Sequence, residues 1–204
     1  LHFGMFPEEV SAAATENLVA LIEKGDWCIG TGFPGTPYIL FALADNGRAD
    51  AAFRMLLNEK CPSWLYEVKT GATTVWERWD GLDEKGQCPI REDGTGGMVS
   101  FNHYAFGAVG DFFYRRIGGI EPTSGGYRTF RVAPLLGGDL TSACARMCSP
   151  YGQIESDWRI EGDEFVLSVC VPVGTECTVV LPSGEEHVFG SGRRVLREKL
   201  VAKG

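Results

Sequence analysis

The sequence lacks any long uninterrupted run of apolar residues. Its longest candidate, "TPYILFALA", is much shorter than the roughly 20 residues that a membrane-spanning helix needs, so we expect no membrane partner. Positive charge is also scarce, since 27 acidic residues against 19 basic ones give a formal net charge of -8. Without a broad positive surface to neutralise phosphates, nucleic acid is not an expected partner either.

Metal and cofactor motifs are missing as well. None of the seven cysteines forms a C-x-x-C, and the closest pair, Cys144 and Cys148, has no second cluster or histidines beside it. The glycines of "TGFPGTP" do not fit the phosphate-loop pattern G-x-x-x-x-G-K-[ST], so we expect a tight turn there. The sequence therefore predicts no metal site, no cofactor and mostly reduced thiols.

The first residues, "LHFGMFPEE", show neither an initiator methionine nor the basic and apolar regions of a signal peptide. We expect a sequence that begins inside a longer protein. The odd number of cysteines favours a reducing cytoplasm, but a signal peptide in a preceding part would mean the periplasm, so the compartment stays open.

What is present indicates a folded protein with two kinds of structure. Apolar residues make up 44% and aromatic residues 11% of the 204 residues, which is enough for a buried core. Up to about residue 120, apolar spacing and capping residues predict helices. The predicted helical stretches are "EEVSAAATENLVALIEKG" after Pro7, "YILFALADNG" after Thr36 and Pro37, "ADAAFRMLLNE", "WLYEVKTG" after Ser63, and "FNHYAFGAVGDFFYRRIGG" after Ser100. Short turns between them are typical of stacked helical hairpins.

The first predicted helix has one apolar face. Val10, Ala14, Leu18, Leu21 and Ile22 fall on it, and Gly25 ends the helix. We expect this face to be the buried one.

After residue 120 the apolar period becomes two. Strand-like runs are separated by turns at Gly162, Gly174 and Gly184, the profile of a small antiparallel β-sandwich. We therefore expect a multidomain α and β chain, with a helical domain over 1–120 and a β domain over 121–204.

The stretch "GATTVWERWDG" places one carboxylate, Glu77, between the indoles Trp76 and Trp79. Apolar walls raise the energy of a charged carboxylate and favour proton transfer, whereas the neighbouring Arg78 favours the charged form. Indole faces also stack on sugar rings. The motif indicates a general base in a carbohydrate site or, alternatively, a solvated turn beside core tryptophans, with Asp80 as a turn residue.

Two further aromatic positions and one histidine are candidates for substrate binding. Trp64 and Trp76 are each either a stacking platform or core packing. His103, in "SFNHYAFG", is either a site residue or an imidazole that satisfies a buried hydrogen bond. The residues alone leave these alternatives open.

Three long segments resemble a known family. "TGFPGTPYILFALADNG", "PSWLYEVKTGATTVWERWDG" and "MVSFNHYAFGAVGDFFYRRIGGI" are similar to the C-terminal part of bacterial α-L-rhamnosidases of glycoside hydrolase family 78. The resemblance implies part of a six-hairpin α/α barrel followed by a β-sandwich. It also implies an inverting glycosidase, with Glu77 as general base, His103 contacting a sugar hydroxyl, and a rhamnose-containing glycoside as substrate.

The chain departs from that family pattern in two places. The family's general acid lies in an upstream stretch, D-x-P-x-R-x-E, which this sequence does not contain. We therefore expect the chain alone to be inactive, and a non-catalytic carbohydrate-binding or structural module is the alternative. The second departure is a longer segment, "DEKGQCPIREDGTGG", after the motif, in which we assign no role to Glu84, Glu92 or Asp93.

A partial barrel should leave some helical faces without a neighbour. We expect "YILFALA" to expose apolar surface and the chain to form a homo-oligomer through such faces.

Overall fold

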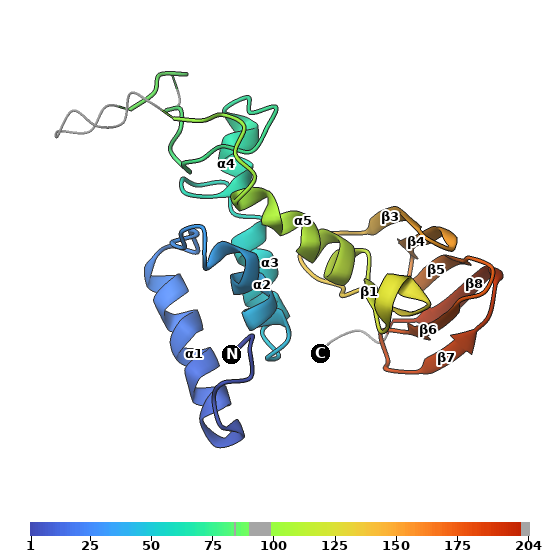
Figure 1. Ribbon diagram of the computed structural model, residues 1–204. Coiled ribbons are helices and arrows are strands. Elements are labelled where there is room, and N and C mark those ends of the chain that lie inside the picture. Colours follow the sequence, from blue (N-terminus) through green and yellow to red (C-terminus); the bar gives the residue numbers. More distant parts are fainter. Residues whose placement is uncertain (84, 90–98, 201–204) are drawn as a thin grey trace. The chain divides into compact units, whose positions relative to one another are not determined.

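The computed structural model describes residues 1–83, 85–89 and 99–200, and it divides into two compact units, Leu1–Gly110 and Asp111–Gly204 (Figure 1). The first unit is helical. Its elements are α1 (Glu8–Lys24), α2 (Thr36–Ala44), α3 (Ala49–Leu56), α4 (Trp64–Lys69), the 3-10 turn η1 (Phe106–Ala108) and the first residues of α5 (Val109–Phe112). The four helices that the sequence predicts before residue 70 are thus confirmed.

Helix α1 begins directly after Pro7, with Glu8 and Glu9 in its first turn and Lys24 in its last. These charges complement the helix dipole. The predicted buried face is only partly right: Ile22 is buried, but Val10 and Leu21 are 41% and 56% exposed. Thr15 and Val19 are buried instead. The burial stripe is therefore rotated away from the most apolar stripe of the helix.

Helices α2 and α3 pack against each other and form the core of the first unit. The side chains that α2 buries are mostly apolar, namely Leu40, Phe41, Ala42 and Leu43. Those that α3 buries are Ala51, Ala52, Phe53, Met55 and Leu56. The prediction that "YILFALA" exposes apolar surface is wrong for most of this segment, because α3 covers it.

Helix α4 begins where the sequence predicts. The Ser63 hydroxyl accepts a hydrogen bond from Tyr66 N at 3.0 Å, which satisfies one of the free N–H groups at the helix start.

The last predicted helix starts later than its sequence indicates. Ser100 is not its cap, and the helical turns run only from η1 through α5 to the π-turn η2 (Phe113–Ile117). The backbone of Ser100 and His103 is bonded instead to the segment around Glu77, which keeps it out of a helix.

The second unit holds two four-stranded sheets. The first sheet has the order β1-β2-β6-β7 and the second β3-β4-β5-β8. The strands are β1 (Ile120–Pro122), β2 (Thr129–Val132), β3 (Ser142–Ser149), β4 (Gly152–Glu161), β5 (Glu164–Val171), β6 (Glu176–Val180), β7 (Glu186–Phe189) and β8 (Gly192–Lys199). The three predicted glycine turns lie between β4 and β5, β5 and β6, and β6 and β7.

Both sheets contribute to one hydrophobic core, as in a β-sandwich. Phe130 and Val179 from the first sheet and Trp158 and Phe165 from the second are all at most 1% exposed. The expectation of a purely antiparallel arrangement is wrong at one point, since β2 and β6 pair in parallel. Among the described helices, none is long and apolar enough to cross a membrane.

Candidate functional site

Glu77 and His103 stand 26 positions apart in the sequence (103 − 77), and the fold places their segments side by side. Glu77 N donates to Ser100 O at 2.9 Å, and His103 N donates to Val75 O at 2.8 Å. The Thr74 hydroxyl adds a third bond between the segments. The predicted base and the predicted histidine are therefore held on paired stretches of backbone.

The carboxylate of Glu77 is half-buried, and one of its oxygens is fixed. Oε2 accepts a hydrogen bond from Ser100 N at 2.9 Å. In the part of the chain that the structure describes, no group bonds Oε1. One oxygen thus orients the carboxylate, and the other can accept a proton.

The arginine beside Glu77 is engaged with a different carboxylate. Arg78 Nε and Nη2 donate to the two oxygens of Asp80 at 3.0 and 2.9 Å. This two-point contact closes the turn after the motif, which is the role expected for Asp80.

His103 is oriented by the backbone and flanked by aromatic rings. Its Nδ1 accepts from Ala105 N at 3.3 Å, so in the neutral imidazole the proton is on Nε2, where it can be donated to a hydroxyl. Phe33 stacks on the imidazole at 4.7 Å and Tyr104 at 5.4 Å between ring centroids. Phe33 is 41% and Tyr104 89% exposed, so these rings offer apolar faces beside the histidine that the sequence argument did not single out.

Trp64 and Trp76 are both buried, at 8% and 2% exposure. Trp64 Nε1 donates to Phe106 O at 3.0 Å, and the Trp76 ring meets Phe101 edge-on at 5.5 Å. These contacts favour core packing for the two indoles, and direct sugar stacking by them stays a prediction. Trp79 is half-buried and lies flat on Phe106 at 3.8 Å between ring centroids.

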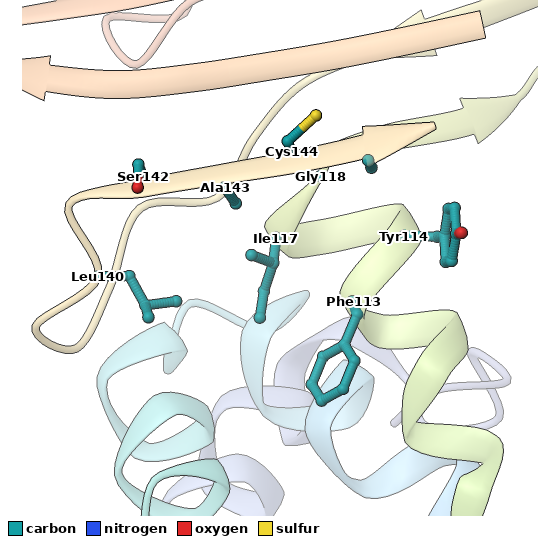
Figure 2. A pocket seen from close by; sticks show the side chains of 9 residues that line it. Phe113, Tyr114, Ile117, Gly118, Leu140, Ser142, Ala143 and Cys144 are labelled. Carbon is teal, nitrogen blue, oxygen red and sulfur yellow. The ribbon is translucent and has the colours of Figure 1, made fainter. Parts of the chain in front are cut away.

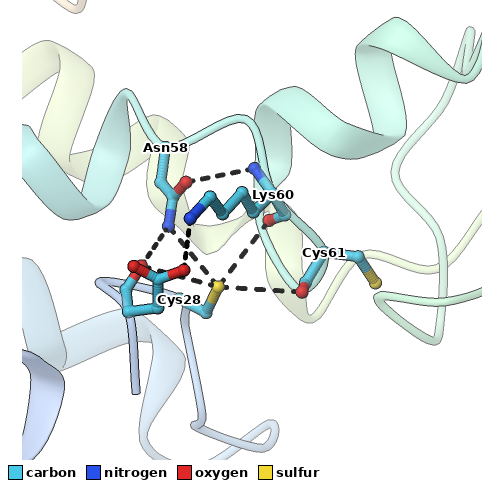
Figure 3. A network of polar contacts seen from close by, with 5 residues as sticks. Cys28, Asn58, Lys60 and Cys61 are labelled. Atoms are coloured by element: carbon cyan, nitrogen blue, oxygen red, sulfur yellow. Dashed lines mark hydrogen bonds and ion pairs between the residues drawn. The ribbon is translucent and has the colours of Figure 1, made fainter. Parts of the chain in front are cut away.

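A polar network ties together the loops that precede the site residues (Figure 3). Asn58 Nδ2 donates to Asp26 O at 3.1 Å and to Cys28 Sγ at 3.5 Å, while its Oδ1 accepts from Lys60 N at 3.0 Å. Lys60 also forms an ion pair with Asp26. Because Ile29 N donates to Pro62 O at 3.0 Å, the loop after α1 is joined to the loop before α4.

One acidic residue near the motif escaped the sequence argument. Glu67, on α4, is only 3% exposed, and its Oε2 accepts from Trp76 N at 3.3 Å. Burial raises the pKa of Glu67 to about 7, an effect that the Trp76 N–H opposes only in part. A signal was available, because Glu67 lies three residues after Trp64 and therefore shares its helix face.

The second unit has an apolar groove of about 340 Å³ (Figure 2). It is lined by the end of the helical turns, the residues after them and the start of β3, including Phe113, Ile117, Leu140 and Cys144. Its lining contains no carboxylate and no histidine, so it offers no acid or base for hydrolysis. Among the described residues, no three His, Cys, Asp or Glu side chains gather as metal ligands.

Comparison with known proteins gives this geometry a family context. Residues 1–117 match the family described as the bacterial alpha-L-rhamnosidase 6 hairpin glycosidase domain, and residues 119–195 match the bacterial alpha-L-rhamnosidase C-terminal domain. The chain belongs to the bacterial α-L-rhamnosidase family. The resemblance carried by the three sequence segments is therefore confirmed.

Relatives in this rhamnosidase family are similar over nearly the whole chain. An alpha-L-rhamnosidase of Streptomyces avermitilis is 42% identical over 195 residues, which cover 94% of this chain and 18% of the relative. One of Formosa agariphila is 38% identical over 184 residues, covering 90% and 19%. The chain thus spans about a fifth of the length of these α-L-rhamnosidases.

Solved rhamnosidase structures agree with the fold. The native enzyme from Aspergillus terreus has a TM-score of 0.88 at 38% identity and is matched over 94% of this chain and 22% of its own. The Streptomyces avermitilis enzyme complexed with L-rhamnose has a TM-score of 0.85 at 38% identity, matched over 97% and 21%. Glu77 and His103 therefore both lie in the part of the chain that matches the six-hairpin glycosidase domain.

Proposed function

We propose that this chain supplies the C-terminal part of an inverting α-L-rhamnosidase that removes terminal α-L-rhamnosyl residues from rhamnosides, with Glu77 as its general base. The observation that carries the proposal is the pairing of the Glu77 and His103 segments by four hydrogen bonds in a chain of this family. The substrate class is supported by the relatives, which are named alpha-L-rhamnosidases, one of them solved with L-rhamnose.

In the proposed mechanism Glu77 Oε1 takes a proton from a water molecule, and the water oxygen attacks the anomeric carbon opposite the leaving group. The glycosidic C–O bond breaks, and a second carboxylic acid protonates the departing oxygen. That acid lies outside this sequence. His103 donates from Nε2 to a hydroxyl of the sugar and so fixes its orientation.

The domain organisation follows the same proposal. Residues 1–120 form part of a six-hairpin α/α barrel, and residues 121–204, which follow in the sequence, form the β-sandwich domain. Trp64 and Trp76 belong to the substrate-binding region by packing beneath it in the core, and the exposed rings of Phe33 and Tyr104 supply the outer aromatic faces.

Hydrolysis of a chromogenic α-L-rhamnoside tests this function. The purified chain is assayed alone, mixed with the preceding part of the parent protein, and as the continuous parent. Glu77→Gln in the continuous parent is expected to lower kcat by about 100-fold to 10,000-fold, because general base catalysis is lost while the shape of the side chain is kept. Glu59→Gln, a surface change at a residue paired with Lys69, is the control.

Activity only where both parts are present, abolished by Glu77→Gln, supports the proposal. Activity of this chain alone would mean that a second carboxylate within it serves as the acid. No activity in any combination, together with retained binding of L-rhamnose, would favour the alternative of a non-catalytic carbohydrate-binding module.

A further inference from the structure

Glu67 is a carboxyl group inside the first unit that the proposed mechanism does not use. Helix α4 buries it on the same face as Trp64, and both side chains are less than a tenth exposed. A buried carboxyl group is costly unless it is paired or protonated. Its position therefore requires a physical reason.

Among the described residues, the one hydrogen bond to the Glu67 side chain comes from the motif. Oε2 accepts from Trp76 N at 3.3 Å, whereas Oε1 is buried with no partner among the described residues. Val75 O and Glu77 N, on either side of Trp76, bond to His103 and Ser100. Val75 O and Trp76 N belong to one trans peptide group and point in opposite directions, so Glu67 holds one edge of the segment and the His103 segment holds the other.

The surroundings of Glu67 favour its neutral form. In the described part of the chain no cation pairs with it: Lys69 of the same helix bonds to Glu59, and Arg78 of the following turn bonds to Asp80. The nearby thiol of Cys61 has its pKa raised mainly by burial and also by Asp80 and Glu67. A neutral acid with one unpaired oxygen is far less costly in such a place than an unpaired charge.

We propose that Glu67, in its carboxylic acid form, is a positioning residue that anchors the Trp76 peptide and thereby fixes Glu77 relative to His103. The kinetic part of this inference rests on the proposed function of Glu77. Ionisation of Glu67 strengthens its bond to Trp76 N but leaves an uncompensated charge, with Oε1 unpartnered among the described residues, buried behind the motif, and this destabilises the segment that carries the base. Misplacement of a reacting group by about 1 Å can cost 100-fold in rate, so the anchor has a catalytic consequence.

Kinetics of the continuous parent protein test the anchor. Glu67→Leu keeps the site apolar but removes the acceptor for Trp76 N, and it is expected to lower kcat about tenfold or more with KM within about twofold. Glu67→Gln keeps an acceptor oxygen and cannot ionise. It is expected to retain kcat within about threefold and to extend activity to higher pH than the wild type, whereas the control Glu59→Gln changes neither. An unchanged kcat in Glu67→Leu would overturn the proposal. A pH–rate profile in which activity falls at the same high pH in Glu67→Gln as in the wild type would also overturn it.

A second measurement on this chain needs no activity. The backbone amide of Trp76 is followed by NMR as the pH is raised, and its shift is expected to titrate near pH 7, the pKa of Glu67. Glu67→Gln should abolish that titration. If the wild-type parent hydrolyses no rhamnoside, the proposed function fails while this titration still decides whether Glu67 anchors Trp76. A Trp76 amide that does not respond to pH in this range would refute the anchor even if Glu67→Leu proved unable to fold.

Discussion

At the scale of single residues, each functional side chain of the proposed site is oriented by one hydrogen bond from a backbone N–H. Glu77 has one carboxylate oxygen held by Ser100 N, and His103 has one ring nitrogen held by Ala105 N. In each side chain the other polar atom is the one that can meet a substrate or water. A preorganised base and a sugar-binding imidazole both require one polar atom that orients the side chain and a second that can contact water or substrate.

Glu67 gives a pH dependence of stability with a defined sign. Its pKa is raised from 4.5 to about 7 in the folded chain, so the folded state holds the proton more tightly than the unfolded one. The resulting stabilisation is fully present below pH 4.5 and is lost as the pH rises through about 7, a loss on the order of 3 kcal/mol.

Denaturant unfolding of this chain and of Glu67→Gln at several pH values measures this effect. The free energy of unfolding of the wild type, relative to the variant, is expected to fall between pH 4.5 and pH 7. A difference between the two proteins that stays constant across that range would contradict the raised pKa.

At the scale of elements, the turn after the motif depends on a glycine. A Cβ at Gly81 would lie 2.8 Å from Trp76 Cε3, and the rigid indole is too buried to move away. Gly81→Ala is therefore expected to destabilise the first unit by about 1–3 kcal/mol through overpacking.

Thermal unfolding compares this variant with Gly30→Ala, where a Cβ would meet no atom within 4 Å. The control should be nearly neutral. Equal stability of the two variants would show that the Trp76 ring is not packed as described.

How well the elements could be predicted depended on whether local signals decided them. The start of α4 was predictable because its cap, Ser63, is a local signal, and the glycine turns of the β unit were predictable for the same reason. The helix expected from Ser100 was not, because its first residues bond to Val75 and Glu77, 23 or more positions away. The parallel pairing of β2 with β6 likewise joins strands that are far apart in the sequence, and no local sequence pattern predicts it.

The candidate site shows the same limit. The motif around Glu77 and the segment of His103 stand out by composition, and the family resemblance assigned them roles. Their pairing and the position of Glu67 depend on tertiary contacts. The burial of Trp64 and Trp76 was one of two alternatives, since an indole suits a core as well as a sugar site.

At the scale of the whole molecule, one group of exposed apolar residues lies on α1 and just before it, whereas α2 buries most of its apolar side chains. Val10 and Leu21 of the helix and Phe3, Met5 and Phe6 before it are between 41% and 83% exposed. We expect this surface to associate in a homo-oligomer when the chain is alone.

Light scattering of the purified chain measures this association. The expected mass is at least twice 22.2 kDa, and a double change of Val10 and Leu21 to serine should reduce it. A measured mass of 22.2 kDa for the wild-type protein, which is the mass of one chain, would contradict the expected association.

The central claim, that Glu77 is the general base of an inverting rhamnosidase, is tested most directly by azide rescue of Glu77→Gln in the continuous parent protein. Azide needs no base, so it can attack the anomeric carbon in place of water while the leaving oxygen is still protonated by the acid. The account predicts that azide restores turnover and that NMR identifies the product as β-L-rhamnosyl azide. A variant that keeps wild-type hydrolysis, or a rescued product of α configuration, would contradict it.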